Sequence, residues 1–274
     1  SIENRCRDVR VQGHDGASVS ILAYKRAPDR EILDRVKVSL VSDPNGSIRI
    51  ATTIASGDEL RPLPAGSVGV DLIILAPRTA HVDVRVWNGR LEISDLDAGA
   101  ELDANEGEIR VTNVSGPVLA RNALGDQAFT AVFGALEAEG IDGNMALDTV
   151  RGNRLEASVQ HGDIVGTRVR AKHLALRTTR GDITLAGEAV LGGTYRLSSA
   201  RGDIQVSFAK VALTVWAETR NGTVTLPPSM KRRERDGAVM ASLGRSKKGA
   251  AIELRTRMGN LTFALADVIS EKTD

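Results

Sequence analysis

The chain has 274 residues, of which 42% are apolar and 26% charged; this is ordinary for a folded protein and long enough for one large domain or two ordinary ones. A net charge of +1 gives no reason to expect nucleic-acid binding by the whole chain. The longest apolar run, VGVDLIILAP, falls far short of the roughly 20 residues that span a bilayer, and a single cysteine, Cys6, excludes an internal disulfide.

Residues 1–80 are predicted to form β-strands without a regular repeat. Turn signals such as HDG, DPNG and RPLPAG separate the strand-like runs DVRVQGHD, SVSILAY, RVKVSLVS, SIRIATT and SVGVDLIILAP. We expect this section to be a β cap, continuous with the repeats that follow, that hides the open edge of the first coil. No signal peptide is visible, so the sequence leaves open whether a leader or membrane anchor precedes Ser1.

Residues 81–226 carry a repeat that is marked by glycine. Eight glycines follow one another at intervals of 18 to 21 residues, and a ninth comes after a further 37. These turn glycines are Gly89, Gly107, Gly125, Gly143, Gly162, Gly181, Gly202, Gly222 and Gly259. The chain has 27 glycines and only 3% aromatic residues, so its core must be built from small aliphatic side chains, which suits thin stacked layers.

Two apolar pairs flank each turn glycine. Around Gly181 they are Leu174 and Leu176 before it, and Ile183 and Leu185 after it, with polar residues between. This alternation predicts two short strands per coil, each with one buried face. Stacked coils about 4.8 Å apart would pair their backbones and close a core that no single coil can close. We therefore predict an all-β, β-helix-like β-solenoid, with a β-sandwich as the alternative.

Two coils depart from this pattern and hold Gln127 and Gly166 where an apolar residue is expected. Two others contain Arg-Gly-Asp, which is an integrin-binding signal in many extracellular ligands. Aligned with the turns NGR, EGE, HGD and NGT, the tripeptide occupies the turn that every coil uses, where glycine allows positive φ and Asp stabilises the turn. We expect Asp163, Asp182 and Asp203 to form a column, and we expect no integrin binding.

Residues 227–274 are predicted to form a basic hairpin insertion followed by a final capping coil. The insertion has seven positive residues against Glu234 and Asp236, a balance of +5: Lys231, Arg232, Arg233, Arg235, Arg245, Lys247 and Lys248. It is either a solvent-exposed segment that protects the open strand edge at the far end of the stack, or an electrostatic contact with anionic lipid, a phosphate-bearing polymer or an acidic partner. Trp216, at an outward position, is the best single candidate for an exposed contact residue unless the insertion covers it.

No residue pattern indicates a catalytic, cofactor or metal site. The sequence has no GxSxG elbow and no P-loop, and its histidines lack metal-ligand spacing: His14, His81, His161 and His173. Outward acidic residues keep a polysaccharide lyase or hydrolase open as an alternative, namely Glu137, Glu139 and Glu156, with Arg121 and Arg154 nearby. We expect no catalytic residues, no cofactor and no metal.

The turns HGDI, RGDI and RGDI at Gly162, Gly181 and Gly202 are similar to the NGDI or SGDI turns of the bacterial putative-adhesin family. The opening IENRCRDVRVQGHDG and the closing ASLGRSKKGAAIELRTRMGNLTF also resemble that family, so the resemblance covers nearly the whole chain. It departs at Cys6 and Arg7 and at Gly259-Asn260. The resemblance implies a β-solenoid without catalytic residues, exported to the bacterial cell envelope or secreted.

Together these observations predict a non-enzymatic envelope or surface module that acts as an adhesin, scaffold or interaction domain. The alternatives are a carbohydrate-active β-helix and an envelope-stress accessory domain that docks on anionic membrane. The expected partners are an envelope component, an anionic polymer or a membrane surface, reached through Lys231, Arg232, Arg233, Arg235 and Trp216; no nucleic acid is expected.

Overall fold

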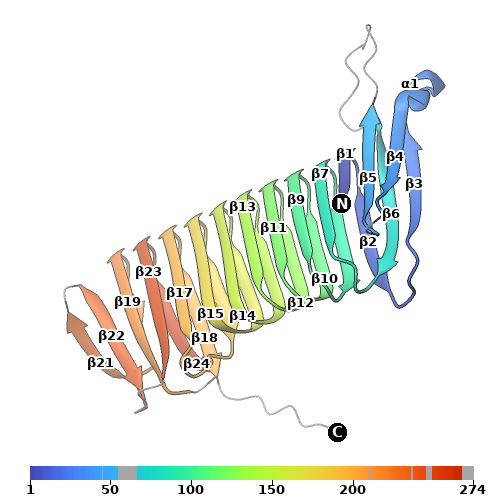
Figure 1. The fold of residues 1–274 in the computed structure, drawn as a ribbon. Helices are drawn as coiled ribbons and strands as arrows, with labels where there is room; N and C mark the ends of the chain where they lie inside the picture. Colours follow the sequence, from blue (N-terminus) through green and yellow to red (C-terminus); the bar gives the residue numbers. More distant parts are fainter. Residues whose placement is uncertain (45, 55–66, 210, 236, 245–248, 267–274) are drawn as a thin grey trace. The chain divides into compact units, whose positions relative to one another are not determined.

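The computed structural model describes residues 1–44, 46–54, 67–209, 211–235, 237–244 and 249–266, and most of them are in β-strands (Figure 1). The chain divides into two compact units, Ser1–Gln127 and Ala128–Asp274. This boundary lies within the predicted repeats rather than at residue 80 or 226. Among the described residues, no helix has the length and apolarity to traverse a bilayer.

The described residues of the first unit form one short helix, α1 (Arg30–Arg35), and eleven strands. The strands are β1 (Ile2–Cys6), β2 (Val9–His14), β3 (Ser20–Arg26), β4 (Val36–Ser42), β5 (Ile48–Ile54), β6 (Gly69–Pro77), β7 (Val82–Asn88), β8 (Leu91–Leu96), β9 (Ala100–Glu106), β10 (Ile109–Ser115) and β11 (Val118–Leu124). β12 (Gln127–Phe133) crosses the boundary.

Successive coils of the first unit stack in parallel. β7, β9 and β11 pair on one side of the coils, and β8 pairs with β10 on the other. Leu91 lies beside Ile109, its equivalent one coil later, and both are fully buried. The predicted β-solenoid with two strands per coil is therefore confirmed.

The N-terminal strands are not at the edge of the first unit. β1 pairs in parallel with both β5 and β7, and β2 with both β6 and β8, so they form an inner coil. The outermost strands are β3 and β4, which run antiparallel to β6 and β5. Because β3 and β4 pair along β6 and β5, neither β5 nor β6 is left as an open edge of the parallel stack.

The second unit is also built from two-strand coils. Its strands are β13 (Leu136–Asp142), β14 (Met145–His161), β15 (Ile164–Arg180), β16 (Ile183–Gly187), β17 (Thr194–Arg201), β18 (Ile204–Ala209), β19 (Leu213–Asn221), β20 (Val224–Thr225), β21 (Lys231–Arg235), β22 (Ala238–Leu243), β23 (Ala250–Met258) and β24 (Leu261–Ala266). β14 and β15 each run through a whole coil, bending where Thr149 and Arg168 take positive φ values of 55° and 53°.

The coils of the second unit do not stack in chain order. β23 lies between β17 and β19 (Figure 1). β24 pairs with β18 on one side and with β20 on the other, and all four pairings are parallel. The prediction that the last coil caps the stack is therefore wrong. β19 and β20 form the outer coil instead, and the predicted hairpin, β21–β22, pairs antiparallel along β19. The hairpin gives the chain enough length to return and insert its last coil.

The predicted inward row forms the core of the second unit. Ile183 lies in register with Ile164 and Ile204, and all three are fully buried. The two unexpected residues are also inward: Gln127 is 1% exposed, and Gly166 leaves room for Leu185, whose Cδ1 would lie 2.8 Å from an added Cβ. Both residues therefore keep inward positions, although the register of β15 with β16 shifts between Gly166 and Val169.

The turn glycines lie against one another along each stack. At Gly181, φ is +147°, and an added Cβ would lie 2.1 Å from the Gly162 carbonyl oxygen, closer than any side chain could approach. The other turn glycines share the positive φ, except for Gly222, where an added Cβ would nevertheless lie 1.9 Å from the Gly259 oxygen. Both constraints require glycine at the turn.

A side-chain hydroxyl three residues before a turn glycine donates a hydrogen bond to the turn glycine of the neighbouring coil. Ser199 Oγ donates to the Gly181 carbonyl oxygen at 3.0 Å. Thr178, Thr256 and Thr219 make the equivalent bond to the glycine of the neighbouring coil. These donors, three of them buried, satisfy carbonyl groups at the corner, where the strand ladder ends.

Candidate functional site

Three of the predicted contact residues, Trp216, Lys231 and Arg233, lie on one outward face of the second unit. Trp216 lies on β19, and the basic residues 231–235 lie on β21, with β22 between them. In the paired register, Trp216 is opposite Met240, and Met240 is opposite Arg233. Thr214, Ser242 and Lys231 form the next row. Because directly opposite residues point to the same side of a sheet, Lys231 and Arg233 share the face of Trp216.

One described basic residue of the hairpin lies away from this face. Strand alternation places Arg232 on the opposite side, together with Glu234, and the two form an ion pair at 2.7 Å. Arg235 pairs through its backbone with Ala238, and its side chain lies outside the described part. Arg245, Lys247 and Lys248 are also outside the described residues. The structure thus divides a cluster that the sequence presents as one patch.

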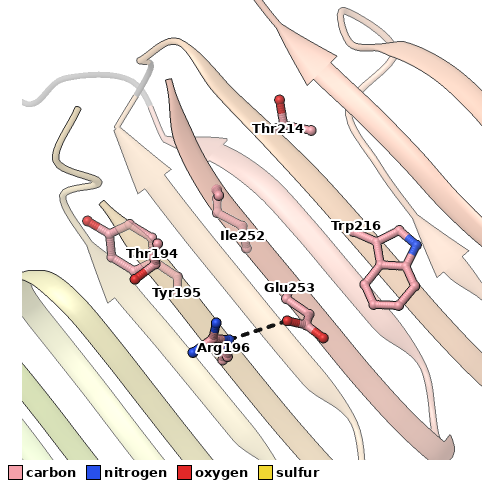
Figure 2. Close-up of a pocket in the computed structure, with 8 residues that line it drawn as sticks. Thr194, Tyr195, Arg196, Thr214, Trp216, Ile252 and Glu253 are labelled. Atoms are coloured by element: carbon pink, nitrogen blue, oxygen red, sulfur yellow. Dashed lines mark ion pairs between the residues drawn. The ribbon is translucent and has the colours of Figure 1, made fainter. Parts of the chain in front are cut away.

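We call the outward side of β17, β23, β19, β22 and β21 the Trp216 face. It contains a shallow hollow of about 220 Å³. The hollow is lined by Thr194, Tyr195, Arg196, Thr214, Trp216, Ala251, Ile252 and Glu253. Figure 2 shows Arg196, Glu253 and Trp216 on three neighbouring strands. Ala251, in the row of Thr194 and Thr214, gives the hollow a small side chain on its central strand.

The half-buried Trp216 side chain is held in place by its neighbours. The guanidinium carbon of Arg255 lies 4.3 Å from the centre of the indole, a cation–π contact. Arg255 also forms ion pairs with Glu253 at 2.8 Å and with Glu218 at 3.6 Å. Glu253 in turn pairs with Arg196 at 3.5 Å. These contacts hold the indole beside the hollow.

The charge of the Trp216 face is positive. Its described outward positions hold six cations and two anions, which leaves +4. The cations are Arg196, Arg220, Lys231, Arg233, Arg255 and Arg257, and the anions are Glu218 and Glu253. The whole chain carries only +1, so cationic charge is concentrated here.

One buried titratable group lies beneath the hollow. The Tyr195 side chain points inward; its hydroxyl donates to the Ala171 carbonyl oxygen at 2.8 Å and accepts the Val190 N–H at 2.7 Å. Burial raises the pKa of Tyr195. Its ring packs on Phe208 at 5.0 Å, so the group serves the core rather than the surface.

The acidic residues that favoured a carbohydrate-active enzyme lie elsewhere. Glu156 pairs with Arg154 at 2.7 Å and lies beside Glu137 on the next strand. Glu139 lies in the next row, and Arg121 belongs to the first unit. None of them lines the hollow.

The histidines make local surface contacts. Nδ1 of His161 lies 2.6 Å from Asp142, and Nδ1 of His173 lies 2.8 Å from the Thr194 hydroxyl. His14 and His81 lie within hydrogen-bonding distance of nearby backbone oxygens. Within the described ranges, no three His, Cys, Asp or Glu side chains converge in a way that could hold a metal ion.

Sequence reasoning found Trp216 and the basic hairpin but missed Arg196, Glu253 and Arg255. Arg255 comes 39 residues after Trp216 in the sequence and becomes its neighbour only because β23 is inserted beside β19. The alternation of β23 does identify Glu253 and Arg255 as outward residues. The sequence could therefore predict on which side of β23 they lie, but not that β19 lies beside β23.

A family model described as Toastrack DUF4097 matches residues 63–263. The chain belongs to the Toastrack DUF4097 family. Strands β1 and β2 of this Toastrack protein precede the matched segment, yet they pair with β7 and β8 inside it. No match was found among curated proteins.

Two crystal structures are similar to this Toastrack chain. One is named a putative cell adhesion protein from Clostridium sporogenes; it has 8% sequence identity and a TM-score of 0.28, and the match covers 97% of this chain and 91% of that one. The other is named a putative adhesin from Bacteroides fragilis, with 11% identity, a TM-score of 0.44, and coverage of 97% and 90%.

Proposed function

We propose that this Toastrack protein is a non-enzymatic interaction module of the bacterial envelope, an adhesin or scaffold that makes contact through the Trp216 face. The observation that carries the proposal is the register Trp216–Met240–Arg233, which brings an aromatic side chain and a basic strand onto one side of the sheet. Aromatic and arginine side chains are enriched where proteins bind partners.

The form of the face favours binding over catalysis. The hollow is shallow and holds one carboxylate, Glu253, whereas most glycoside hydrolases place two carboxyl groups on either side of the scissile bond. Glu253 is engaged by Arg196 and Arg255. This arrangement positions a contact surface and offers no pair of acid and base groups.

The envelope placement rests on the likeness of the HGDI and RGDI turns to those of a bacterial adhesin family. The two Arg-Gly-Asp tripeptides take no part in the proposed contact. Their aspartates, Asp182 and Asp203, accept backbone N–H groups of the next coil at 2.7 Å and so serve the turns. We therefore assign adhesion to the Trp216 face and not to these turns.

Binding to isolated bacterial envelopes tests this proposal. Purified protein would be sedimented with envelopes, and the same samples would be assayed for release of reducing or unsaturated sugar ends. We expect sedimentation without release of sugar, and a loss of sedimentation when Trp216→Thr is combined with Arg233→Glu. Trp87→Phe, at a tryptophan that is 64% exposed in the first unit, is the matched control. Release of sugar, or equal binding by the double variant, would contradict the proposal.

A further inference from the structure

We infer that the Trp216 face binds an acidic polysaccharide, with one sugar ring in the hollow beside Trp216 and carboxylate or sulfate groups of neighbouring sugars on the surrounding cations. This inference deepens the proposed function and rests on it, because it names the ligand of the same face.

The lining of the hollow suits a sugar ring. Trp216 supplies an aromatic surface for the C–H groups of the sugar ring. Thr194 and Thr214, which lie in one row with Ala251, supply hydroxyl groups. Glu253 and Arg196 supply an acceptor and a donor for sugar hydroxyls. A volume of about 220 Å³ is below the roughly 300–1,000 Å³ of sites that enclose a drug-sized ligand, so the hollow seats one ring and leaves the chain outside.

The cations extend beyond the hollow along the direction in which the strands stack. Arg196 and Arg233 lie in one row across β17, β23, β19, β22 and β21. Four strand spacings of about 4.8 Å place their backbones about 19 Å apart. Only a chain of several linked sugars reaches both, and only an acidic one gains from the +4 balance of the face. The geometry thus favours a polymer over a single sugar.

A membrane surface fits this face less well. Binding in the plane of a bilayer uses several large apolar side chains that project into it. Among the described outward residues of the Trp216 face, Met240, 42% exposed, is the most exposed large apolar side chain. Trp216 is half-buried, and Ala251 lies within a hollow. A single aromatic residue also fits single-stranded nucleic acid poorly, since successive bases stack on successive aromatic side chains.

The test uses the full chain with Trp87→Phe, which leaves Trp216 as the sole tryptophan. Four probes would be titrated at low salt: oligogalacturonate, a heparin-derived sulfated oligosaccharide, an uncharged dextran oligosaccharide, and phosphatidylglycerol–phosphatidylcholine vesicles. Tryptophan emission and calorimetry would report binding. We expect the acidic oligosaccharides to bind and to change the Trp216 emission, with affinity falling steeply as salt rises, and we expect dextran and vesicles to bind at least tenfold more weakly.

Three variants locate the site. Ala251→Leu fills the hollow without changing charge and is expected to weaken binding about tenfold. Arg233→Glu is expected to weaken it about fivefold, whereas its neighbour Arg232→Glu, with the same change of charge on the opposite face, should alter it less than about twofold. Circular dichroism and thermal melting check that all three variants remain folded.

Equal losses from Arg232→Glu and Arg233→Glu, an unaffected Ala251→Leu, or vesicle binding as tight as oligosaccharide binding would each overturn the inference. If no acidic oligosaccharide binds but envelope sedimentation still depends on Trp216 and Arg233, the inference fails and the proposed function stands. If neither the oligosaccharides nor the envelopes bind through this face, both fail.

Discussion

The backbone N–H of Asp203 donates a hydrogen bond to the Asp182 carboxylate at 2.7 Å, and the two residues end Arg-Gly-Asp tripeptides in neighbouring coils. The same bond links Asp163 to Asp182, and Asp203 to Asn260. A column of like charges would be unfavourable on its own. Here each carboxylate accepts a backbone donor from the next coil, which offsets the repulsion and ties the turns together.

Removing one acceptor from this column should have a small, measurable effect. Asp182→Ala leaves the Asp203 N–H to water and is expected to lower the free energy of unfolding by about 1 kcal/mol. Asp182→Asn keeps a side-chain oxygen and should lower it less. Urea denaturation compares the two variants. An equal loss for both would show that the accepting oxygen is not what matters.

The inward row should be far less tolerant. Ile183 is fully buried between Ile164 and Ile204, so Ile183→Asn loses packing and buries an amide without a partner. We expect a loss of about 3–5 kcal/mol. The adjacent outward residue gives the control, since Thr184→Asn should cost less than about 1 kcal/mol. Comparable unfolding midpoints for the two variants would mean that the faces of β16 are assigned incorrectly.

Two glycines separate backbone strain from steric contact. At Gly202, φ is +150°, and an added Cβ would lie 2.0 Å from the Gly181 oxygen; at Gly192, φ is +72°, and no atom lies within 4 Å of the added Cβ. Gly192→Ala is therefore expected to cost about 1–2 kcal/mol, from strain alone. Gly202→Ala must also displace the neighbouring coil and should cost at least about 3 kcal/mol. Thermal unfolding distinguishes them, and similar melting temperatures would refute the steric argument.

The contact between Asp95 and Asn113, in the first unit, gives a prediction about the pH dependence of stability. The Asn113 amide donates to Asp95 Oδ1 at 2.6 Å, and this hydrogen bond is the main reason why the pKa of Asp95 is below its ordinary value. A lowered pKa in the folded state stabilises the fold above the unfolded value of about 3.9. That contribution is lost as the pH falls through the lowered folded value.

Asn113→Gly should remove the donor at little backbone cost, because φ is +55° at this position. We expect NMR titration to show the pKa of Asp95 rising towards its ordinary value. Hydrogen bonds from Ser94 and Gln12 and the charge of Arg78 should still hold it partly down. An unchanged Asp95 titration would contradict the assigned cause.

The architecture of a single coil could be predicted from sequence because its determinants are local. Gly181, Ile183 and Leu185 define a turn and an inward face within five residues. The order of the coils could not be predicted in this way. The turns at Gly222 and Gly259 follow the same pattern, so either coil fits next to Gly202, and the choice depends on the return path through the β21–β22 hairpin.

The candidate site was only half predictable for the same reason. Alternation within β19 identified Trp216 as outward, but its neighbours Arg255 and Met240 come from strands whose register is set by pairing. Lys231, Arg232 and Arg233 look equivalent in the sequence. Only the register with β22 separates Arg232 from the other two.

The most direct test of the account is whether Arg233, and not Arg232, shares the face of Trp216. In a Cys6→Ser, Trp87→Phe background, a nitroxide quencher would be attached to Arg233→Cys or to Arg232→Cys, and the emission of Trp216 would be measured. We predict that a nitroxide at position 233 quenches the Trp216 emission strongly and that one at position 232 quenches it little. Equal quenching, or stronger quenching from position 232, would contradict it.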